Sequence, residues 1–264
     1  MVTIVIVGCG YTGRRVALSL AHLGHQVIAT SRDTSKLDGL PVTAVRFDLE
    51  SGSLRDTIHP ESLVLVSTPV VDRRLAEAVA VAERVVFLST TGVYGAQSEV
   101  HADTEPAPRT EREKARLHSE TLLPPEAMIL RAAAIYGPHR GVHAAIREGR
   151  YRLAGEGANY VSRIHVDDLA AHCVGALFTR TSGAWPVADQ EPCTSREIAE
   201  FCSGLLDLPI PPSAAPEELG ETRQTDRRVD GSAVRALLGL TLRYPSYRSG
   251  LPACAAAEAE ARAR

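Results

Sequence analysis

The sequence predicts an α/β protein built around a doubly wound parallel sheet, with a smaller lobe towards the C-terminus. Continuous apolar, β-branched runs such as VTIVIV at residues 2–7 are typical of parallel strands buried on both faces. Such runs alternate with segments of helical periodicity, which is the pattern of a parallel sheet covered by helices. After about Tyr136 the alternation loosens. We therefore expect a sheet core at residues 1–140 and a mixed region at 141–264 that returns partly to the core at about 160–180.

Each element is expected from its own pattern. The strands are expected where apolar residues run together, at residues 2–7, 25–30, 42–48, 62–68, 84–90 and 127–137. The helices are expected where apolar residues recur three or four positions apart, within residues 8–25 (closed by Gly24), 71–83, 109–123, 143–149, 166–179, 194–206 and 230–239, with a helical or frayed tail from about residue 253. The Pro- and Gly-rich segment 209–224 is expected to be an exposed loop.

Two of the C-terminal helices carry start signals. Thr194 or Ser195 precedes a periodic apolar segment, and Glu197 is placed for a capping box. Asp167 and Asp168 put negative charge into the first turn of the other helix, where the helix dipole favours it. Both helices are therefore expected to begin near these residues.

Composition limits the classes of function. The 264 residues, 44% apolar and with a formal charge of −3, fit a globular domain and argue against binding to nucleic acid or to an acidic membrane surface. The five cysteines are odd in number and form no CxxC pair, which suits free thiols in a reducing cytoplasm. No apolar run is long enough to span a membrane. We expect a cytoplasmic protein, a monomer or homodimer, that acts on a small-molecule substrate.

A glycine-rich turn follows the first strand. Residues 8–13, GCGYTG, form a GxGxxG pattern after a strand and at the start of a helix, which is the context that a dinucleotide-binding (Rossmann) turn requires. Gly8 permits the tight turn, Gly10 lets the backbone approach a pyrophosphate, and Gly13 lets helix and strand pack closely. The first 140 residues are therefore predicted to bind NAD(P). The candidate cofactor-binding residues of the turn are Gly8, Gly10, Tyr11, Thr12 and Gly13.

The end of the second strand selects the dinucleotide. An acidic residue there binds the ribose 2′-hydroxyl of NAD, whereas an arginine accommodates the 2′-phosphate of NADP. Ser31 and Arg32 stand at this point, so NADP is favoured. In the alternative, Arg32 is a solvated loop residue and Asp33 binds the ribose of NAD.

Five further stretches resemble the short-chain dehydrogenase/reductase superfamily, in particular its extended and atypical NAD-dependent epimerase/dehydratase-like branch. They follow one another in the family's order and spacing, and they are FDL at 47–49, STP at 67–69, LSTTGVYG at 88–95, the LR…IYGP stretch at 130–138 and RIHVDDLA at 163–170. The resemblance implies a Rossmann fold with a small C-terminal substrate-binding lobe. It also implies that Asp48, with Leu49, meets the adenine ring and that Ser67 and Thr68 lie against the cofactor.

The resemblance further implies a catalytic set that this sequence contains only in part. Thr90 stands where the family's Ser or Thr hydrogen-bonds the substrate oxygen. In active members a Tyr transfers the proton, helped by a Lys four residues later, and this spacing puts both side chains on one helical face. The helix expected at 109–123 contains no Tyr.

Two alignments of this helix remain open. If Lys114 is the family's lysine, Thr110 takes the tyrosine position. If Glu120 matches the Glu that usually follows the lysine by four residues, Arg116 takes the lysine position and Arg112 the tyrosine position. The second alignment keeps the helix register and is preferred.

Three functional hypotheses follow from the missing tyrosine. In the first, an oxidoreductase uses another proton donor, for which Tyr94, Lys114, His139 and His165 are candidates. In the second, hydride reaches an iminium or an activated double bond without an enzymatic acid. In the third, the protein binds NAD(P) without turnover, as a sensor or regulatory protein. Epimerisation of a keto-sugar is a further alternative.

Arginines predict the character of the substrate. Those that the resemblance places near the cofactor or pocket are Arg112, Arg116, Arg131, Arg140, Arg147 and Arg163. A guanidinium suits a carboxylate or a phosphate, so a small anionic carbonyl or imine compound is the hypothesis. The candidate catalytic residues are Thr90, Tyr94, Arg112, Lys114 and Arg116, and the candidate substrate-binding residues are Thr91, His139, Arg140 and Arg163. No HExxH motif or Cys/His cluster is present, so no metal site is predicted.

Overall fold

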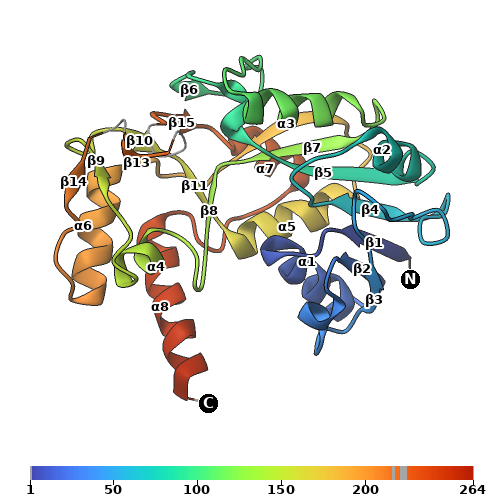
Figure 1. Ribbon diagram of the computed structural model, residues 1–264, viewed down its shortest axis with the longest axis horizontal. Helices are drawn as coiled ribbons and strands as arrows, with labels where there is room; N and C mark the ends of the chain where they lie inside the picture. Colours follow the sequence, from blue (N-terminus) through green and yellow to red (C-terminus); the bar gives the residue numbers. More distant parts are fainter. Residues whose placement is uncertain (1, 216–217, 221–224, 264) are drawn as a thin grey trace.

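The computed structural model describes residues 2–215, 218–220 and 225–263. Its main sheet has seven parallel strands in the order β12-β7-β5-β4-β1-β2-β3, with helices on both faces (Figure 1). The strands are β1 (Thr3–Val7), β2 (Gln26–Ser31), β3 (Thr43–Arg46), β4 (Leu63–Val66), β5 (Arg84–Thr90), β7 (Met128–Ala132) and β12 (Gly183–Val187). The predicted doubly wound parallel sheet is confirmed.

The chain reverses its direction across the sheet between β3 and β4. From β1 it adds β2 and β3 on one side, and it then returns to place β4, β5 and β7 on the other side of β1. Open parallel sheets bind ligands outside the carboxyl ends of their strands, at this switch point. The glycine-rich turn that follows β1 therefore lies at the expected place for a ligand.

The two faces of the sheet have separate cores. The covering helices are α1 (Tyr11–His22) and α5 (Val166–Leu177) on one face, and α2 (Arg73–Val79) and α3 (Glu111–Thr121) on the other (Figure 1). In β1, Ile4 and Ile6 belong to the core under α1 and α5, whereas Val5 and Val7 belong to the core under α2. All four side chains are fully buried, which explains the uninterrupted apolar run.

The segment expected to form one sixth strand forms two. β7 lies between β5 and β12, while β8 (Ala134–Tyr136) pairs with β11 (Arg163–His165) outside the main sheet. The change occurs at Ala133, whose N–H donates to Val187 O, before the N–H of Ala134 turns to Ser162 O. Both pieces are largely apolar, so periodicity does not show that they have different neighbours.

The edge strand β12 is absent from the predicted strands. Its sequence GAWPV includes Pro186, and proline argues against a strand because it has no N–H to donate. β12 pairs only with β7, so a proline is tolerated there. The C-terminal region consequently contributes α5 and β12 to the core, a longer stretch than residues 160–180.

The other C-terminal elements form a lobe beside the carboxyl ends of the strands (Figure 1). They are α4 (Val142–Arg147), β9 (Leu153–Ala154), β10 (Tyr160–Val161), β13 (Cys193–Thr194), α6 (Ser195–Leu206), β14 (Ser213–Ala214) and α8 (Tyr247–Ala263). The lobe has its own core, in which Ile146, Ile198 and Leu251 are buried. Between lobe and sheet, α7 (Ser232–Leu238) packs on α5, and β15 (Arg228–Val229) pairs with β6 (Glu99–Val100).

The start of α6 agrees with its predicted signal, whereas α8 begins before the helical tail expected from about residue 253. The predicted capping box of α6 is present, because Glu197 N–H donates to Thr194 Oγ1 (3.1 Å) and Thr194 N–H to Glu197 Oε2 (2.7 Å). α8 begins earlier than the expected tail and continues through Pro252. Like the other helices of the described residues, it lacks the length and apolar character needed to cross a membrane. Within the expected loop at 209–224 the structure contains β14, and residues 216–217 and 221–224 lie outside the described residues.

Arg84 joins the sheet to segments that come much later in the chain. Its Nε donates to Ala176 O (3.0 Å), its Nη1 to Glu126 O (3.0 Å) and its Nη2 to Thr181 O (2.5 Å). These carbonyls lie near the end of α5 and just before β7 and β12. The buried guanidinium therefore holds the start of β5, the end of α5 and the edge of the sheet together.

Candidate functional site

The turn between β1 and α1 is the centre of the candidate site. Gly8 adopts φ +81°, in the left-handed region, and its N–H donates to Thr30 Oγ1 (3.0 Å). A Cβ at this residue would lie 2.8 Å from Thr68 Cγ2, so no larger residue fits. The turn is thus held tightly between the ends of β2 and β4.

The turn leaves open space at Gly10. A Cβ there would meet only Gly8 O, at 4.0 Å, whereas a Cβ at Gly13 would press on Ile6 (3.3 Å) and Cys9 (3.5 Å). The N-terminus of α1 has no side-chain cap, so amides of its first turn remain available to an anion and add to the positive end of the helix dipole. Thr12 is buried behind them. The turn therefore fits the pyrophosphate of a dinucleotide.

Asp33, the acidic residue that follows β2, already has hydrogen-bond partners within the protein. The carboxylate of Asp33 accepts hydrogen bonds from Ser35 N (3.2 Å) and Ser35 Oγ (2.7 Å), and the bond from the Ser35 side chain is the main reason that its pKa is lowered. Ser31 Oγ accepts from Asp33 N–H (3.2 Å). Arg32 is exposed and makes no side-chain hydrogen bond or ion pair within the described residues. Arg32 is therefore the side chain at this strand end that is available to a 2′-phosphate.

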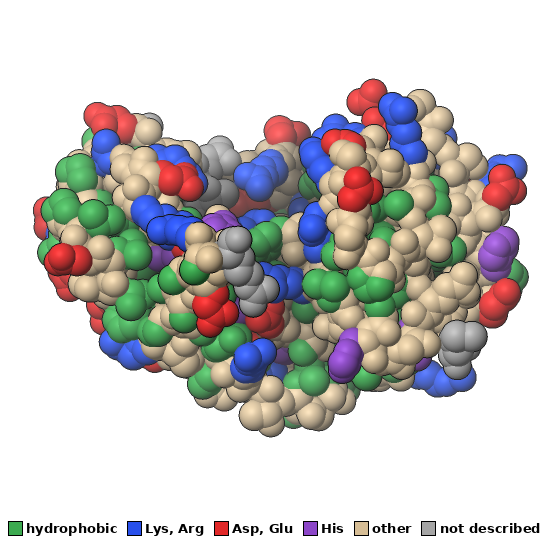
Figure 2. All heavy atoms as spheres, turned by 90° about the horizontal axis from the view of Figure 1, so that it is seen from below, with side chains coloured by type: hydrophobic (Ala, Val, Ile, Leu, Met, Phe, Trp, Pro, Cys, Tyr) green, Lys and Arg blue, Asp and Glu red, His purple; other side chains and the backbone are tan. Residues whose placement is uncertain are grey.

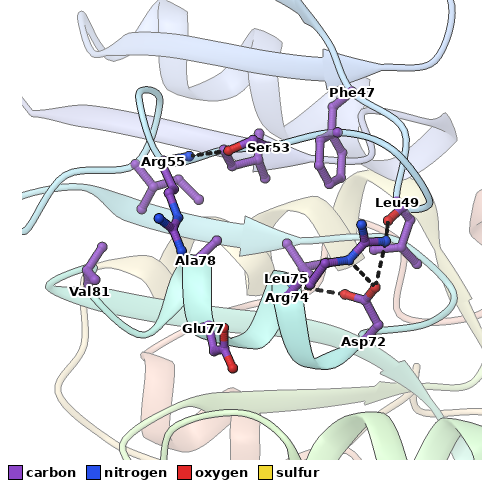
Figure 3. A pocket seen from close by; sticks show the side chains of 13 residues that line it. Phe47, Leu49, Ser53, Arg55, Asp72, Arg74, Leu75, Glu77, Ala78 and Val81 are labelled. Carbon is purple, nitrogen blue, oxygen red and sulfur yellow. Dashed lines mark hydrogen bonds and ion pairs between the residues drawn. The ribbon is translucent and has the colours of Figure 1, made fainter.

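At the end of β3 a cavity of about 430 Å³ lies between residues 47–58 and α2 (Figure 3). Phe47 and Leu49 line one end of it, and Ala78 and Val81 line another part. Arg74 fixes this loop by donating to Leu49 O (2.7 Å) and Glu50 O (2.8 Å), as Figure 3 shows in part. The cavity therefore begins beside the FDL stretch and continues along α2, but Asp48, the residue expected to meet the adenine ring, is not part of its lining.

The carboxylate of Asp48 has a local role beside this cavity. Asp48 Oδ1 accepts from Glu50 N–H (3.0 Å), which stabilises the turn after β3.

A second cavity, of about 540 Å³, opens at the amino ends of the strands and is lined by Leu63 and Phe178 among others. That cavity lies at the opposite edge of the sheet from the glycine turn, so it is not part of the candidate site.

Helix α3 presents Arg116, and not Lys114, to the end of β4. Arg116 Nη1 donates to Thr68 O (3.2 Å), and the guanidinium carbon lies 5.6 Å from the ring centre of Phe87. The side chain of Lys114 is 54% exposed and forms an ion pair of 2.8 Å within the first turn of the same helix. Thr110 is the N-cap and lies outside the helix. The geometry therefore favours the alignment with Arg116 in the lysine position and places the candidate Lys114 away from the site.

Arg116 is a partly desolvated cation with few partners. Burial lowers the pKa of its guanidinium, and the neighbouring charge of Arg112, one turn earlier, lowers it further. Across the residues that the structure describes, no carboxylate lies within ion-pairing distance of Arg116, because Glu120 is held by Arg131 (2.7 Å). Arg112 is exposed. The two guanidinium groups therefore retain N–H donors that an anion can use.

The face of the molecule in Figure 2 is hollowed between its two ends, and Lys and Arg side chains gather around the hollow. The sheet provides one side of this region and the lobe the other, as the arrangement in Figure 1 shows. A hollow with basic walls suits an anionic ligand such as a dinucleotide.

Tyr94 lies in a buried network and not at the edge of the site. Its side chain is 0% exposed, and its hydroxyl accepts from Arg131 Nη1 (3.2 Å). Glu120 completes the network by accepting from Arg131 and from Ser89 Oγ (2.6 Å). Burial raises the pKa of Tyr94. As a candidate proton donor Tyr94 is therefore disfavoured, because it has no exposed face towards a substrate.

Thr90 is a further candidate catalytic residue that the structure leaves available. It ends β5 and is the N-cap of η2 (Thr91–Tyr94), where its Oγ1 accepts from Gly92 N–H (3.1 Å). A hydroxyl that accepts one bond can still donate its own proton. Thr91 is buried and its carbonyl accepts from Arg227 Nη1 (2.7 Å), so its predicted contact with substrate is disfavoured.

The loop at residues 137–140 closes on the glycine turn. Tyr11 Oη donates to Pro138 O (2.9 Å), and the guanidinium carbon of Arg140 lies 5.1 Å from the centre of the Tyr11 ring. His139 is 62% exposed at its side chain. His139 and Arg140 are therefore exposed beside the turn, as expected for residues that meet a ligand.

Arg163 and His165 lie inside the protein. Arg163 is 5% exposed, and its Nη1 donates to Val161 O (2.6 Å) and Cys193 Sγ (3.1 Å). His165 is 2% exposed, and burial lowers its pKa to about 4. The predicted substrate contact of Arg163 and the candidate proton transfer by His165 are both disfavoured, because neither side chain reaches the surface.

Two residues that no sequence pattern indicates support the site. Arg227 donates to three carbonyls of the segment after β5, namely those of Thr91, Gly95 and Gln97. Glu258 of α8 accepts hydrogen bonds from the loop at 137–140 and from α4. An isolated Arg or Glu in a polar C-terminal segment carries no motif, so these contacts appear only in the folded chain. Within the described residues no group of His, Cys, Asp and Glu is arranged to hold a metal ion.

Comparison with known proteins supports the fold. No protein-family model matches the chain. A curated relative from Streptomyces sp., 3-diazoavenalumate denitrifying reductase, is 31% identical over 138 residues, which cover 47% of this chain and 45% of the relative. The match therefore spans less than half the length of the relative.

Solved structures match over nearly the whole chain. A functionally unknown conserved protein from Silicibacter pomeroyi DSS has a TM-score of 0.82 and 28% identity, covering 97% of this chain and 99% of its own. MoeE5, solved in complex with UDP-glucose and NAD, has a TM-score of 0.82 and 20% identity, covering 99% of this chain and 100% of its own. The sheet and the lobe are thus both shared with known proteins.

Proposed function

We propose that this protein is an NAD(P)H-dependent reductase of a small anionic compound. The observation that carries the proposal is the turn at residues 8–13, which lies at the switch point of the sheet with open space at Gly10 and an uncapped helix behind it. The resemblance to NAD-dependent short-chain enzymes and the NAD held by the structural neighbour MoeE5 support the same cofactor class.

NADP is the preferred cofactor in this proposal. Asp33, the residue that would hold the ribose of NAD, instead caps the short helix η1 (Thr34–Leu37). Arg32 is exposed beside it and is free of a carboxylate within the described residues. A guanidinium in this position suits the 2′-phosphate.

The reduced cofactor would supply hydride, and this chain's own residues would orient the acceptor. Thr90 can donate a hydrogen bond to the substrate, and Arg116 with Arg112 can bind its anionic group. α3 contains no tyrosine, so the proposal requires an acceptor that takes hydride without a phenolic proton donor.

A diazonium group is an acceptor of this kind. Hydride adds to its terminal nitrogen, and the resulting diazene loses N₂ and leaves a C–H bond, while the nicotinamide is oxidised by two electrons. The name of the curated relative describes a reductase that removes nitrogen from a diazo carboxylate. Iminium ions and activated double bonds meet the same requirement, so a carboxylated electrophile of one of these kinds is the proposed substrate class.

The first test is a titration of the purified protein with NADPH and NADH, followed by nicotinamide fluorescence. Arg32→Ala is expected to weaken NADPH binding by roughly 10- to 100-fold, because hydrogen bonds to a charged group contribute about 1.5–3 kcal/mol. NADH binding should stay the same. Arg180→Ala, an exposed arginine at the far edge of the sheet, is the matched control.

Other outcomes would favour the alternative functions. Tight binding without turnover on any electrophile would indicate a sensor or regulatory protein. Binding of a nucleoside diphosphate sugar together with NAD would indicate a sugar epimerase. Failure of the wild-type protein to bind either reduced or oxidised cofactor would overturn the proposal.

A further inference from the structure

The loop at residues 137–140 is strained as well as closely packed. Gly137 and Arg140 exchange two backbone hydrogen bonds of 2.9 Å, which close a tight turn. Inside this turn His139 adopts φ +62°, a left-handed conformation that costs energy for a residue with a side chain. A Cβ at Gly137 would lie 2.5 Å from Tyr11 Oη, so the loop touches the glycine turn with no room between them.

The last helix of the chain holds this loop in place. Glu258 of α8 is 1% exposed, and its Oε1 accepts from the backbone N–H of His139 (2.5 Å) and from His143 Nε2 (3.1 Å). Its Oε2 accepts from Arg147 Nη1. One buried carboxylate thus joins α8 to the strained residue of the loop and to both ends of α4.

A second contact joins the start of α8 to the residue before the loop. Tyr136 Oη donates to Ser246 O (3.3 Å), and a Cβ at Gly250 would lie 2.2 Å from the same hydroxyl. The start of α8 therefore packs against Tyr136, just before the loop, and Glu258, further along α8, bonds to the loop itself. α8 can thus set the position of the whole segment.

The charge of Glu258 suits this role. Burial alone would raise its pKa, but the hydrogen bonds from Arg147, the His139 backbone and His143 outweigh burial and lower the pKa to about 2. Burial lowers the pKa of His143, and Nε2 is the ring nitrogen that faces the carboxylate and donates to it. The carboxylate is consequently ionised near neutral pH and accepts from all three donors.

We propose that Glu258 is a positioning residue for the dinucleotide site. It fixes the left-handed turn at His139, the turn fixes Pro138 against Tyr11, and Tyr11 fixes the start of α1, whose amides face the phosphates. The inference that the site in question binds a dinucleotide rests on the proposed function. The mechanical coupling from α8 to the glycine turn rests only on the contacts above.

Hydrogen exchange of the cofactor-free protein tests the coupling. Glu258→Ala is expected to increase the exchange rates of amides in residues 137–141 and in residues 8–13 by at least tenfold. Leu251→Ala is the control, because it removes a fully buried side chain from α8 but leaves the Glu258 contacts in place. It should destabilise α8 through lost packing but increase exchange in residues 8–13 by much less than Glu258→Ala, because the Glu258 hydrogen bonds remain.

Two further variants distinguish a positioning role of Glu258 from a general loss of stability. Glu258→Gln keeps one acceptor oxygen and is expected to restore part of the protection, and it serves if Glu258→Ala does not fold. Tyr11→Phe removes the hydroxyl that reaches Pro138. In this background Glu258→Ala should change exchange in residues 8–13 less than it does in wild type, because the hydrogen bond to Pro138 is gone while the contact of Arg140 with the ring remains.

The result that overturns the inference is equal exchange in residues 8–13 for wild type, Glu258→Ala and Leu251→Ala. An NADPH titration of the same proteins distinguishes the two proposals. Wild type that fails to bind cofactor refutes the proposed function, while the exchange data still decide the coupling. Wild type that binds, with Glu258→Ala at least fivefold weaker and Leu251→Ala much less affected, supports both.

Discussion

Among single residues, Asp189 is a buried carboxyl group with little hydrogen bonding. It follows β12 and is 3% exposed, and its Oδ1 accepts only a long bond from Glu191 N–H (3.4 Å). Its Oδ2 is buried and has no hydrogen-bond partner in the part of the chain that the structure describes. Burial raises its pKa from 3.8 to about 8. Asp189 is therefore largely protonated near neutral pH in the folded protein.

This protonation predicts how stability depends on pH. Between about pH 4 and pH 8 the folded protein keeps a proton that the unfolded chain has released, so the contribution of Asp189 to stability decreases as pH rises through this window. Asp189→Asn stays neutral and should unfold at a higher temperature than wild type at pH 8. Near pH 4 the difference should vanish. Thermal unfolding at several pH values measures it, and a difference that is independent of pH would contradict the assignment.

At the same scale, Arg116 is the residue on which substrate affinity should depend. Arg116→Ala should raise KM for an anionic acceptor by roughly 10- to 100-fold, because a charge-assisted bond to a carboxylate is lost. The probes are a benzenediazonium ion that carries a carboxylate and the same ion without it, each with NADPH and a blank without enzyme. Lys114→Ala, a solvent-facing residue of the same helix, is the control. Equal losses for both probes would contradict anion recognition.

At single residues, sequence indicates the local geometry best where a short-range pattern decides the environment. The glycines of the turn and the helical register that faces Arg116 to the sheet both follow from short-range spacing. Tyr94 and Arg163 have no such signal. Their burial depends on Arg131 and Cys193, which are distant in the sequence, so no local pattern shows that their polar atoms are already used.

At the scale of elements, α3 depends on its N-terminal cap. Glu113 N–H donates to Thr110 Oγ1 (3.3 Å), and Glu113 Oε2 accepts from Thr110 N–H (3.1 Å). The same capping box begins α6 at Thr194, far from the glycine turn. The same kind of capping box can therefore be removed either near the candidate site, at Thr110, or away from it, at Thr194.

We predict that Thr110→Ala and Thr194→Ala each reduce the free energy of unfolding by about 1 kcal/mol. Only Thr110→Ala should also raise KM for the anionic substrate, because the first turn of α3 carries Arg112. Denaturant unfolding and steady-state kinetics measure the two effects. A rise in KM for Thr194→Ala of the same size would show that stability alone is responsible.

Strands and helices differ in how far sequence predicts them. Parallel strands buried on both faces, such as β1, β4 and β5, are almost continuously apolar, so their sequences alone predict them. The same uniform apolarity hides the break at Ala133, where the chain leaves the sheet. β12 was missed because Pro186 is tolerated only at an edge, and the position of a strand in the sheet is a property of the whole fold.

For the whole molecule, the boundary at residue 140 does not separate two independent folding units. α5 and β12 follow that boundary, yet α5 covers one face of the sheet and β12 forms its edge. Arg84 donates to carbonyls on both sides of the boundary, those of Glu126, Ala176 and Thr181. Without α5, the core around Ile4, Ile6 and Leu130 would be open to water.

A fragment of residues 1–140 is therefore expected not to fold, because one apolar face of its sheet is exposed. Near-ultraviolet circular dichroism and denaturant unfolding test this expectation against the full chain. A cooperative unfolding transition of the fragment would contradict it. Extending the fragment to residue 190 restores α5 and β12, so this longer chain should recover part of the cooperative transition.

The long sequence separation between the glycine turn and Glu258 has a consequence for biosynthesis. The ribosome makes residues 8–13 long before it makes Glu258, so under the proposed coupling a nascent chain does not have a rigid dinucleotide site until residue 258 has emerged and α8 has folded. Ligand binding stabilises only a state that can bind it. A product that terminates before residue 258 would then lack this protection, and cellular proteases would remove it in preference to the finished protein.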